Sequence, residues 1–156
     1  MMELLKAQTI AEGIISQLTP YCCRIEIAGS IRRKCPFVKD IDLVLIPNNQ
    51  GALAFKLTEM MGAPKLAGNK LIRCQMPAIT VDIYVATPET WATMFLIRTG
   101  SAKHNIKLCT LAQRQGMKLH ADGSGLTKGA LRIAGDTEES IFHALGLPFI
   151  PPEQRN

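Results

Sequence analysis

Two aspartates near the start of the chain, Asp40 and Asp42, have the type and spacing to hold a metal ion. They open the apolar run 40–47, which predicts a strand, and side chains two residues apart on a strand point to the same face. Two neighbouring carboxylates repel each other unless a cation lies between them, and Mg²⁺ prefers carboxylate oxygens that it shares with substrate phosphates. The pair therefore predicts a site for Mg²⁺ or Mn²⁺.

A Gly-Ser turn precedes these aspartates and has the features of a phosphate site. The alternating run 22–28 predicts a strand that ends at Gly29 and Ser30. Glycine lets the backbone approach a ligand closely, and a short helical turn after it offers free N–H groups to an anion. Arg32 and Arg33 add positive charge beside the turn.

A third carboxylate, Asp82, lies in the middle of the apolar run 79–85. Burying an acidic side chain in a strand is costly unless something pairs with it. If this strand neighbours strand 40–47, a strand spacing of about 5 Å makes Asp82 available to the same metal ions. The alternative is an exposed aspartate on a solvated sheet face.

Size and charge set limits on the class of protein. The chain has 156 residues, of which 47% are hydrophobic, and this is enough for one substantial core with a small appendage. Eighteen Lys and Arg residues against 13 Asp and Glu residues give a net charge of +5, which favours an anionic partner such as nucleic acid or a nucleotide. A basic protein that binds nothing acidic is the alternative.

The sequence also carries signals about its compartment. No signal peptide opens it, and no apolar run reaches the roughly 18 residues of a membrane span. Its five cysteines lack zinc-type spacing, so we expect them to be reduced. We therefore expect a cytoplasmic or nucleoid-associated protein that is not secreted and does not bind a membrane.

The remaining patterns predict an α+β fold. We expect helices over 3–18, 52–61, 87–98 and 101–115, and strands over 22–28, 40–47, 70–76 and 79–85. Short apolar runs between 117 and 133 predict a small antiparallel sheet, and a last short helix begins near Asp136. The result is a mixed sheet packed against helices, followed by a smaller α+β part.

The predicted helix 101–115 carries a basic stripe. Lys103, Lys107 and Arg114 project within about 40° of one another at 100° per residue. Such a stripe contacts a phosphate backbone or is a solvated face. Asn105 projects to nearly the opposite side, so it does not share a contact with the stripe.

Taken together, these motifs resemble the nucleotidyltransferase superfamily, and more narrowly the family X DNA polymerases, the group that includes DNA polymerase beta. The residues that carry the resemblance follow in order along nearly the whole chain: Gly29-Ser30-Ile31-Arg32-Arg33, Asp40-Ile41-Asp42, Val81-Asp82-Ile83, Thr99-Gly100-Ser101 with Asn105, and the tail Leu145-Gly146-Leu147-Pro148-Phe149-Ile150-Pro151-Pro152-Glu153. The resemblance implies a palm over 1–98 and a thumb-like nucleotide-selection part over 99–156. Only about twenty residues precede the first predicted strand, which leaves no room for the lyase and helix-hairpin-helix domains of larger relatives, so we expect neither domain and weak DNA binding.

The resemblance also implies roles for individual residues. Asp40 and Asp42 hold two Mg²⁺ or Mn²⁺ ions, and Asp82 holds the catalytic ion and helps to take the proton from a primer 3′-hydroxyl. Ser30 and Arg33 grip the β- and γ-phosphates of the nucleotide with help from the Gly29 backbone. The sugar and minor-groove side of the nucleotide is lined by Thr99, Gly100, Ser101 and Asn105. Apart from the resemblance, their positive charge predicts weak DNA contacts for Arg32, Lys103, Lys107 and Arg114.

Two departures from the family pattern leave parts of the function open. Ile97 and Arg98 stand where many members carry an aromatic pair next to the sugar, which leaves the choice between dNTP and rNTP open. Ile106 and Cys109 stand where relatives meet the templating base, which leaves template dependence open.

The predicted function is that of a monomeric, magnesium-dependent DNA polymerase of the DNA repair type. It adds dNTPs to a primer 3′-hydroxyl on a primer–template, in short gaps. One alternative is a nucleotidyltransferase that needs no template. The other is a palm that binds nucleic acid without catalysis.

Overall fold

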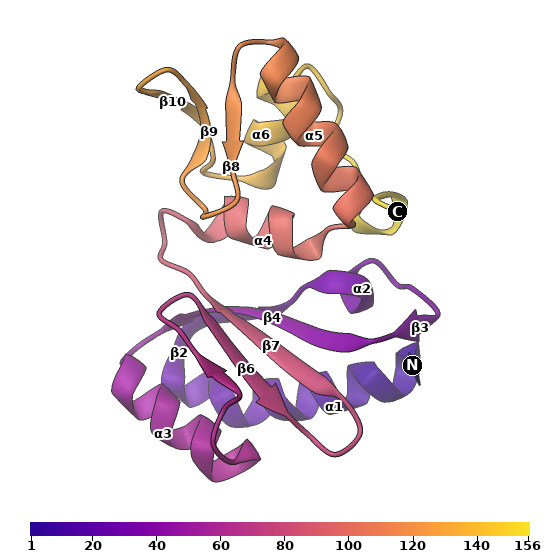
Figure 1. Cartoon of the computed structure of the whole chain (residues 1–156), viewed down its shortest axis with the longest axis vertical. Helices are drawn as coiled ribbons and strands as arrows, with labels where there is room; N and C mark the ends of the chain where they lie inside the picture. The colour runs from indigo at the N-terminus through magenta and orange to yellow at the C-terminus, as the bar shows by residue number, and fades with distance from the viewer.

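The computed structural model describes residues 1–156 and shows two parts, one above the other, with helix α4 between them (Figure 1). The helices are α1 (Leu4–Leu18), α2 (Gly29–Arg32), α3 (Gln50–Met61), α4 (Trp91–Thr99), α5 (Ala102–Arg114) and α6 (Glu138–Ala144), with 3₁₀ turns at Thr19–Tyr21 and Pro152–Gln154. The strands are β1 (Met2–Glu3), β2 (Cys22–Ile27), β3 (Phe37–Val38), β4 (Asp40–Pro47), β5 (Leu66–Ala67), β6 (Leu71–Gln75), β7 (Thr80–Val85), β8 (Lys118–His120), β9 (Gly125–Lys128) and β10 (Leu131–Ala134).

The first part is built on a five-stranded mixed sheet in the order β2-β4-β7-β6-β5. The central pair β4 and β7 is parallel, and the other neighbours are antiparallel. Helices α1 and α3 cover one face, where Leu43, Leu45 and Ile83 pack with Leu18 and Leu53. The expected mixed sheet packed against helices is confirmed.

The opposite face of the central strands packs against α4. Val44 of β4 and Tyr84 of β7 form a second cluster with Trp91 and Met94 of that helix. Because alternate residues of a strand share a face, Asp40, Asp42 and Asp82 lie on this same side of the sheet, beyond the covered apolar residues. The sheet therefore presents its acidic residues toward the second part of the chain.

The second part has its own small core. Helices α5 and α6 pack on an antiparallel sheet in the order β10-β9-β8, with Leu108, Leu126, Ile141 and Phe142 buried between them. Thr137 caps α6 in a capping box that it completes with Ser140. This confirms the small α+β part expected after the sheet.

Helix α4 links the two cores. Its first turns pack on the sheet through Trp91 and Met94, while Leu96 and Ile97 belong to the core of the second part. Our boundary between residues 98 and 99 falls at the end of this shared helix. Whether the chain divides there into two domains stays a prediction.

One element begins later than expected. The helix predicted from Thr87 starts only at Trp91. Thr90 Oγ1 accepts from Thr87 N at 2.9 Å, and Thr90 N donates to Thr87 Oγ1 at 3.3 Å, so the two threonines close a turn instead of capping a helix at Thr87. No helix of this structure has the length and apolar character needed to cross a bilayer.

Candidate active site

The site begins with two carboxylates on neighbouring strands. In the parallel pair of β4 and β7, Asp42 stands directly opposite Asp82, and Asp40 stands opposite Thr80. Sheet pairing alone thus brings Asp42 and Asp82 to neighbouring strands, with Asp40 one step along the same face. Residues 40 apart in sequence meet here because β7 inserts next to β4.

The Gly-Ser turn packs directly against this edge. Ala28 N donates to the Asp42 backbone oxygen at 2.8 Å, which ties the turn to β4. Gly29 has a φ of +59°, and a Cβ added to it would overlap the Asp42 carboxylate. Glycine is required here both by the left-handed backbone and by the approach of the carboxylate.

The Asp42 carboxylate is not neutralised within the protein. None of the six ion pairs of the structure involves it. Burial and then the charges of Asp40 and Asp82 raise the pKa of Asp42 to about 7, and the more distant charges of Arg33 and Arg98 only partly oppose this. The edge therefore carries more negative charge than its surroundings compensate.

Asp82, in contrast, is fully engaged. Its side chain is 5% exposed, and its two oxygens accept hydrogen bonds from Arg73 Nε at 2.6 Å and Arg73 Nη2 at 2.8 Å. Arg73 lies opposite Asp82 on the antiparallel strand β6. In this structure no three His, Cys, Asp or Glu side chains converge closely enough to hold a metal ion.

The residues nevertheless fit a divalent cation in their chemistry. The donors are hard carboxylate oxygens, the ligands that Mg²⁺ and Mn²⁺ prefer. Asp42 lies against the space left by Gly29 and lacks a cationic partner, which a metal ion would supply. Asp82 would join Asp42 in holding such an ion only if it left Arg73.

The residues expected to grip phosphates lie beside this edge. No side-chain hydrogen bond occupies the Ser30 hydroxyl, and Ser30 is half-buried at the start of α2. The Arg33 guanidinium donates to the Thr99 backbone oxygen, and Arg33 Nε donates to Asn156 Oδ1 at 3.0 Å. Arg33 thus joins the Gly-Ser turn to the end of α4 and to the C-terminus.

The Thr-Gly-Ser element lies across from that turn. Thr99 is buried, and its hydroxyl accepts from Arg32 Nη1 at 2.7 Å, so this side chain is used within the protein. Gly100 has a φ of +67°, and a Cβ added to it would come within 3.2 Å of Arg33 Nη1. Ser101 caps α5 by accepting from His104 N at 3.2 Å.

Asn105 is turned toward the same region from the first turn of α5. Its Nδ2 donates to the Ile97 backbone oxygen at 2.8 Å. Its Oδ1 is buried and has no partner in the protein. A buried acceptor without a partner is costly, so this oxygen is a candidate to contact a ligand.

The residues expected to contact DNA separate into two groups. Lys103, Lys107 and Arg114 are exposed on α5. Arg32, in contrast, is 19% exposed, and both of its terminal nitrogens donate to Glu138, at 2.7 and 2.8 Å. Arg32 also stacks on Phe95 at 3.7 Å. We therefore assign Arg32 to the contact between the two parts and leave it out of the DNA surface.

Two arginines at the site were not foreseen from the sequence. The first is Arg73, whose position opposite Asp82 could have been obtained by counting back from the turn at Pro77-Ala78, because β6 and β7 form a hairpin. The second is Arg98, which stacks over the Tyr84 ring at 4.4 Å and has a buried Nε without a partner. Its charge opposes the rise in the pKa of Asp42.

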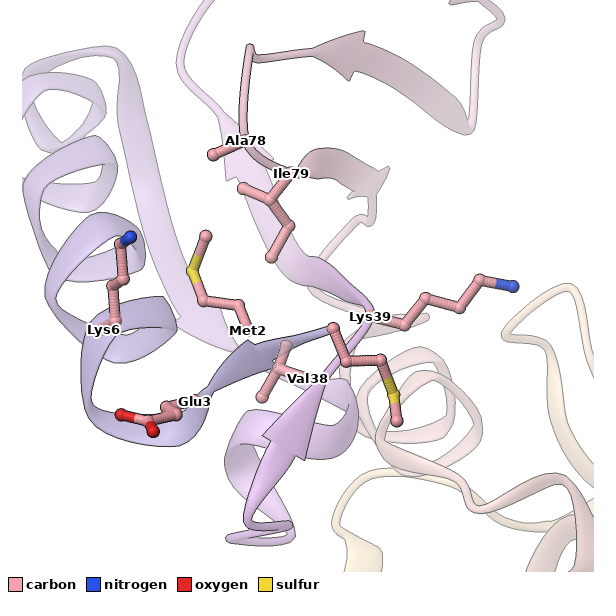
Figure 2. Close-up of a pocket in the computed structure, with 8 residues that line it drawn as sticks. Met2, Glu3, Lys6, Val38, Lys39, Ala78 and Ile79 are labelled. Carbon is pink, nitrogen blue, oxygen red and sulfur yellow. The ribbon is translucent and has the colours of Figure 1, made fainter.

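The acidic edge opens into a polar hollow, while a larger cavity lies elsewhere. The hollow has a volume of about 400 Å³ and no hydrophobic residue in its lining, which consists of Lys39, Asp40, Lys65, Arg73, Gln75, Thr80 and Asp82. A cavity of about 480 Å³ lies by the β1–β3 ribbon, where the side chains of Met2 and Ile79 enter it (Figure 2). None of the three aspartates lines that cavity, so size alone would have pointed to the wrong place.

Comparison with known proteins agrees with this architecture. Residues 94–156 match the model of the DNA polymerase beta thumb. The chain is 27% identical over 149 residues to a DNA polymerase/3′-5′ exonuclease PolX of Bacillus subtilis (strain 168), a match that covers 92% of this chain and 26% of the relative. The chain thus spans about a quarter of the length of this curated relative.

A solved structure is similar over almost the whole chain. The crystal structure of Leishmania infantum polymerase beta, described as a ternary P/T complex, superposes with a TM-score of 0.83 at 20% identity, covering 99% of this chain and 76% of that chain. The fold is therefore that of the polymerase beta palm and thumb. The thumb model and the PolX relative add a similarity in sequence to family X polymerases.

Proposed function

We propose that the chain catalyses metal-dependent, template-directed addition of dNTPs to a primer 3′-hydroxyl in short DNA gaps. The observation that supports this most strongly is the register that places Asp42 opposite Asp82. The Asp42 carboxylate lies against Gly29 of the Gly-Ser turn and has no paired cation. Buried negative charge without a cation does not stabilise a fold. Phosphoryl transfer needs it, because this chemistry depends on positioning and on charge neutralisation.

The three aspartates are the proposed metal ligands. Asp40 and Asp42 would bind both of two Mg²⁺ or Mn²⁺ ions, and Asp82 would bind the catalytic one. When bound, such ions neutralise charge on the triphosphate and on the transferred phosphoryl group. Asp82 also lines the polar hollow, and once released from Arg73 it would be placed to take the proton of a primer 3′-hydroxyl.

Ser30 and Arg33 are the proposed phosphate contacts. The Ser30 hydroxyl is free to donate, and the Arg33 guanidinium lies between the Gly-Ser turn and Gly100. Arginine suits this task because its planar donors match phosphate oxygens in pairs. To take up a nucleotide, Arg33 would give up its contact with Asn156.

Sugar and minor-groove contacts are assigned to the Thr-Gly-Ser element and Asn105. The Thr99 side chain is already occupied by Arg32, so its contribution would come from its backbone. Asn105 Oδ1 has no partner and can accept a hydrogen bond. Gly100 and Ser101 connect these two contacts at the start of α5.

The basic stripe of α5 is the proposed DNA surface. Lys103, Lys107 and Arg114 are exposed, so each can displace a counterion from a phosphate. Binding should therefore weaken steeply with salt, and replacing one of these residues should lower the salt slope by about one counterion.

The face of α5 assigned to the template supports a second candidate function. Ile106 is 66% exposed, and Cys109 is half-buried with a pKa raised by burial. Neither side chain offers a strong hydrogen bond to a base, which favours transfer without strict templating. Incorporation on gapped, blunt and single-stranded primers separates the two functions, since only the first needs a template.

The proposed function is tested by primer extension on a gapped duplex, with each dNTP and rNTP supplied singly, with and without Mg²⁺. We expect extension that requires Mg²⁺ and that is abolished by Asp82→Ala. Asp136→Ala, which removes an exposed carboxylate that does not line the polar hollow, is the matched control and should extend normally. Circular dichroism verifies that both variants fold. Undiminished extension by Asp82→Ala would refute the assignment.

A further inference from the structure

The pairing of Arg73 with Asp82 is stronger than a surface ion pair. The guanidinium covers both carboxylate oxygens, at 2.6 and 2.8 Å, and the carboxylate is almost fully buried while the Arg73 side chain is 45% exposed. A paired, charge-assisted contact of this kind holds its acceptor in one orientation. Arg73 thus occupies the oxygen atoms that a cation would need.

The Arg73 guanidinium also borders a second possible binding site. It borders the wholly polar hollow together with Lys39 and Lys65, so three cations face the two carboxylates Asp40 and Asp82 there. Lys65 Nζ donates to Gln75 Oε1 at 3.1 Å, and this contact holds Lys65 at the hollow independently of Asp82. Once Asp82 is neutralised by a metal ion, the hollow has an excess of positive charge that suits a phosphate group.

We propose that Arg73 is a positioning residue that releases Asp82 to a divalent cation when a nucleic-acid phosphodiester binds in this hollow. The inference rests on the proposed function of the three aspartates. Asp82 takes the Nε and Nη2 donors of Arg73 and leaves Nη1 free, so the release requires a phosphate that binds the paired Nε–Nη2 edge. A metal ion at Asp82 and a phosphate on that edge favour the same rotated state of Arg73, and each then strengthens the binding of the other.

This coupling limits metal binding in the absence of DNA. Without a strand in the hollow, the cation competes with Arg73 for Asp82. With a strand present, Arg73 has an alternative partner and the competition is relieved. The site would thus assemble fully only when a strand is bound.

The test measures Mn²⁺ binding by electron paramagnetic resonance, with and without a short single-stranded DNA oligonucleotide that ends in a dideoxynucleotide. Without DNA, we expect Arg73→Gln to bind Mn²⁺ about fivefold more tightly than the wild type. A change in affinity of this size corresponds to the loss of a strong but partly exposed ion pair. The oligonucleotide should tighten Mn²⁺ binding about fivefold in the wild type and leave Arg73→Gln unchanged.

Two controls isolate the role of Arg73. Lys65→Gln removes a cation of the same hollow that does not touch Asp82, so it should weaken oligonucleotide binding without changing the affinity for Mn²⁺ alone. An oligonucleotide with an uncharged methylphosphonate backbone should not tighten Mn²⁺ binding in the wild type, because the coupling requires a phosphodiester charge.

Three outcomes would overturn the inference. Mn²⁺ affinity in Arg73→Gln equal to or weaker than in the wild type would show that Arg73 does not compete for Asp82. Equal tightening by the oligonucleotide in both proteins would place the coupling elsewhere. The third outcome is that the wild type binds no Mn²⁺, or that Asp42→Asn binds it as well as the wild type does. The proposed function itself then fails together with the inference, and this result differs from the first two.

Discussion

Two clusters of buried charge contact helix α2, and they are built in opposite ways. In the first, Glu138 accepts hydrogen bonds from Arg32 and from Arg155 Nη1, the latter at 3.0 Å, and Arg155 has no exposed surface. In the second, Asp42 stands beside Asp40 and Asp82 and has no paired cation. One cluster is compensated within the chain, and the other is not.

The pKa values of the two acids express this difference. Burial by itself raises the pKa of Glu138, but the hydrogen bonds and charges of Arg32 and Arg155 outweigh it and hold that pKa below its usual range. For Asp42, burial and the neighbouring carboxylates act together, and the pKa rises to about 7. The comparison teaches that charge used to join the two parts is paired, while charge left unpaired marks the edge proposed to bind metal.

The largest effect should come from breaking the compensated cluster. In Glu138→Gln the buried Arg155 guanidinium loses its charge partner, and Arg32 loses one of its two acceptors. We expect the free energy of unfolding to fall by about 4 kcal/mol, as for other broken buried pairs. Urea denaturation measures this, and a loss below about 1 kcal/mol would show that the cluster does not hold the two parts together.

A smaller effect on stability, but a large one on activity, should follow from filling the space beside Asp42. Gly29→Ala places a Cβ where the Asp42 carboxylate lies and forces alanine to a φ of +59°. We expect a loss of about 2–3 kcal/mol in stability and about a hundredfold in extension rate. Gly13→Ala, at an exposed helical glycine with nothing near its added Cβ, is the control; it should raise stability by about 0.5–1 kcal/mol through helix propensity and leave extension unchanged.

The third prediction is a gain in stability. Removing the negative charge of Asp42 should raise the free energy of unfolding of the metal-free protein. The pKa of Asp42 is 3.8 in an ordinary environment and about 7 in the fold, so the folded state loses stability as the pH rises from the first value through the second. Asp42→Asn should be about 2 kcal/mol more stable than the wild type at pH 8 and equal to it near pH 4. Thermal unfolding across this pH range tests the prediction, and a less stable variant at pH 8 would contradict it.

The smallest effect belongs to an exposed pair that resembles the compensated cluster only in its residue types. Arg132 Nη1 and Asp136 Oδ1 are 2.7 Å apart, but Asp136 is 86% exposed. Asp136→Asn should change stability by no more than about 0.5 kcal/mol, because water competes for both charges. A loss close to that of Glu138→Gln would show that burial is not what separates the two pairs.

Much of this site could be predicted from the sequence because it depends on local rules. The two-residue spacing of Asp40 and Asp42 determines that they share a face, and the apolar residues around Asp82 indicate a buried strand. The Gly29-Ser30 turn follows from glycine at the end of a strand. The register that sets Asp42 against Asp82 required the fold, since residue spacing alone left an exposed Asp82 open.

What could not be predicted depends on contacts between distant residues. Nothing near Arg32 in the sequence indicates that its partner is Glu138, 106 positions away, so its charge was interpreted as a DNA contact. The α4 helix was expected four residues early because Thr87 and Pro88 form a typical helix start, whereas here Thr87 pairs with Thr90 in a turn. Arg98 was noted as a departure from the family, but its stacking on Tyr84 required coordinates.

The most direct test of the central claim is the titration of the Asp42 carboxyl carbon by NMR, with and without Mg²⁺. We predict a pKa of about 7 in the absence of Mg²⁺, because burial and the charges of Asp40 and Asp82 raise the pKa and the charges of Arg33 and Arg98 only partly oppose this. Saturating Mg²⁺ should lower the pKa well below its metal-free value, since a bound ion favours the charged form. An ordinary aspartate pKa that Mg²⁺ does not change would contradict the claim that this acidic edge binds a divalent cation.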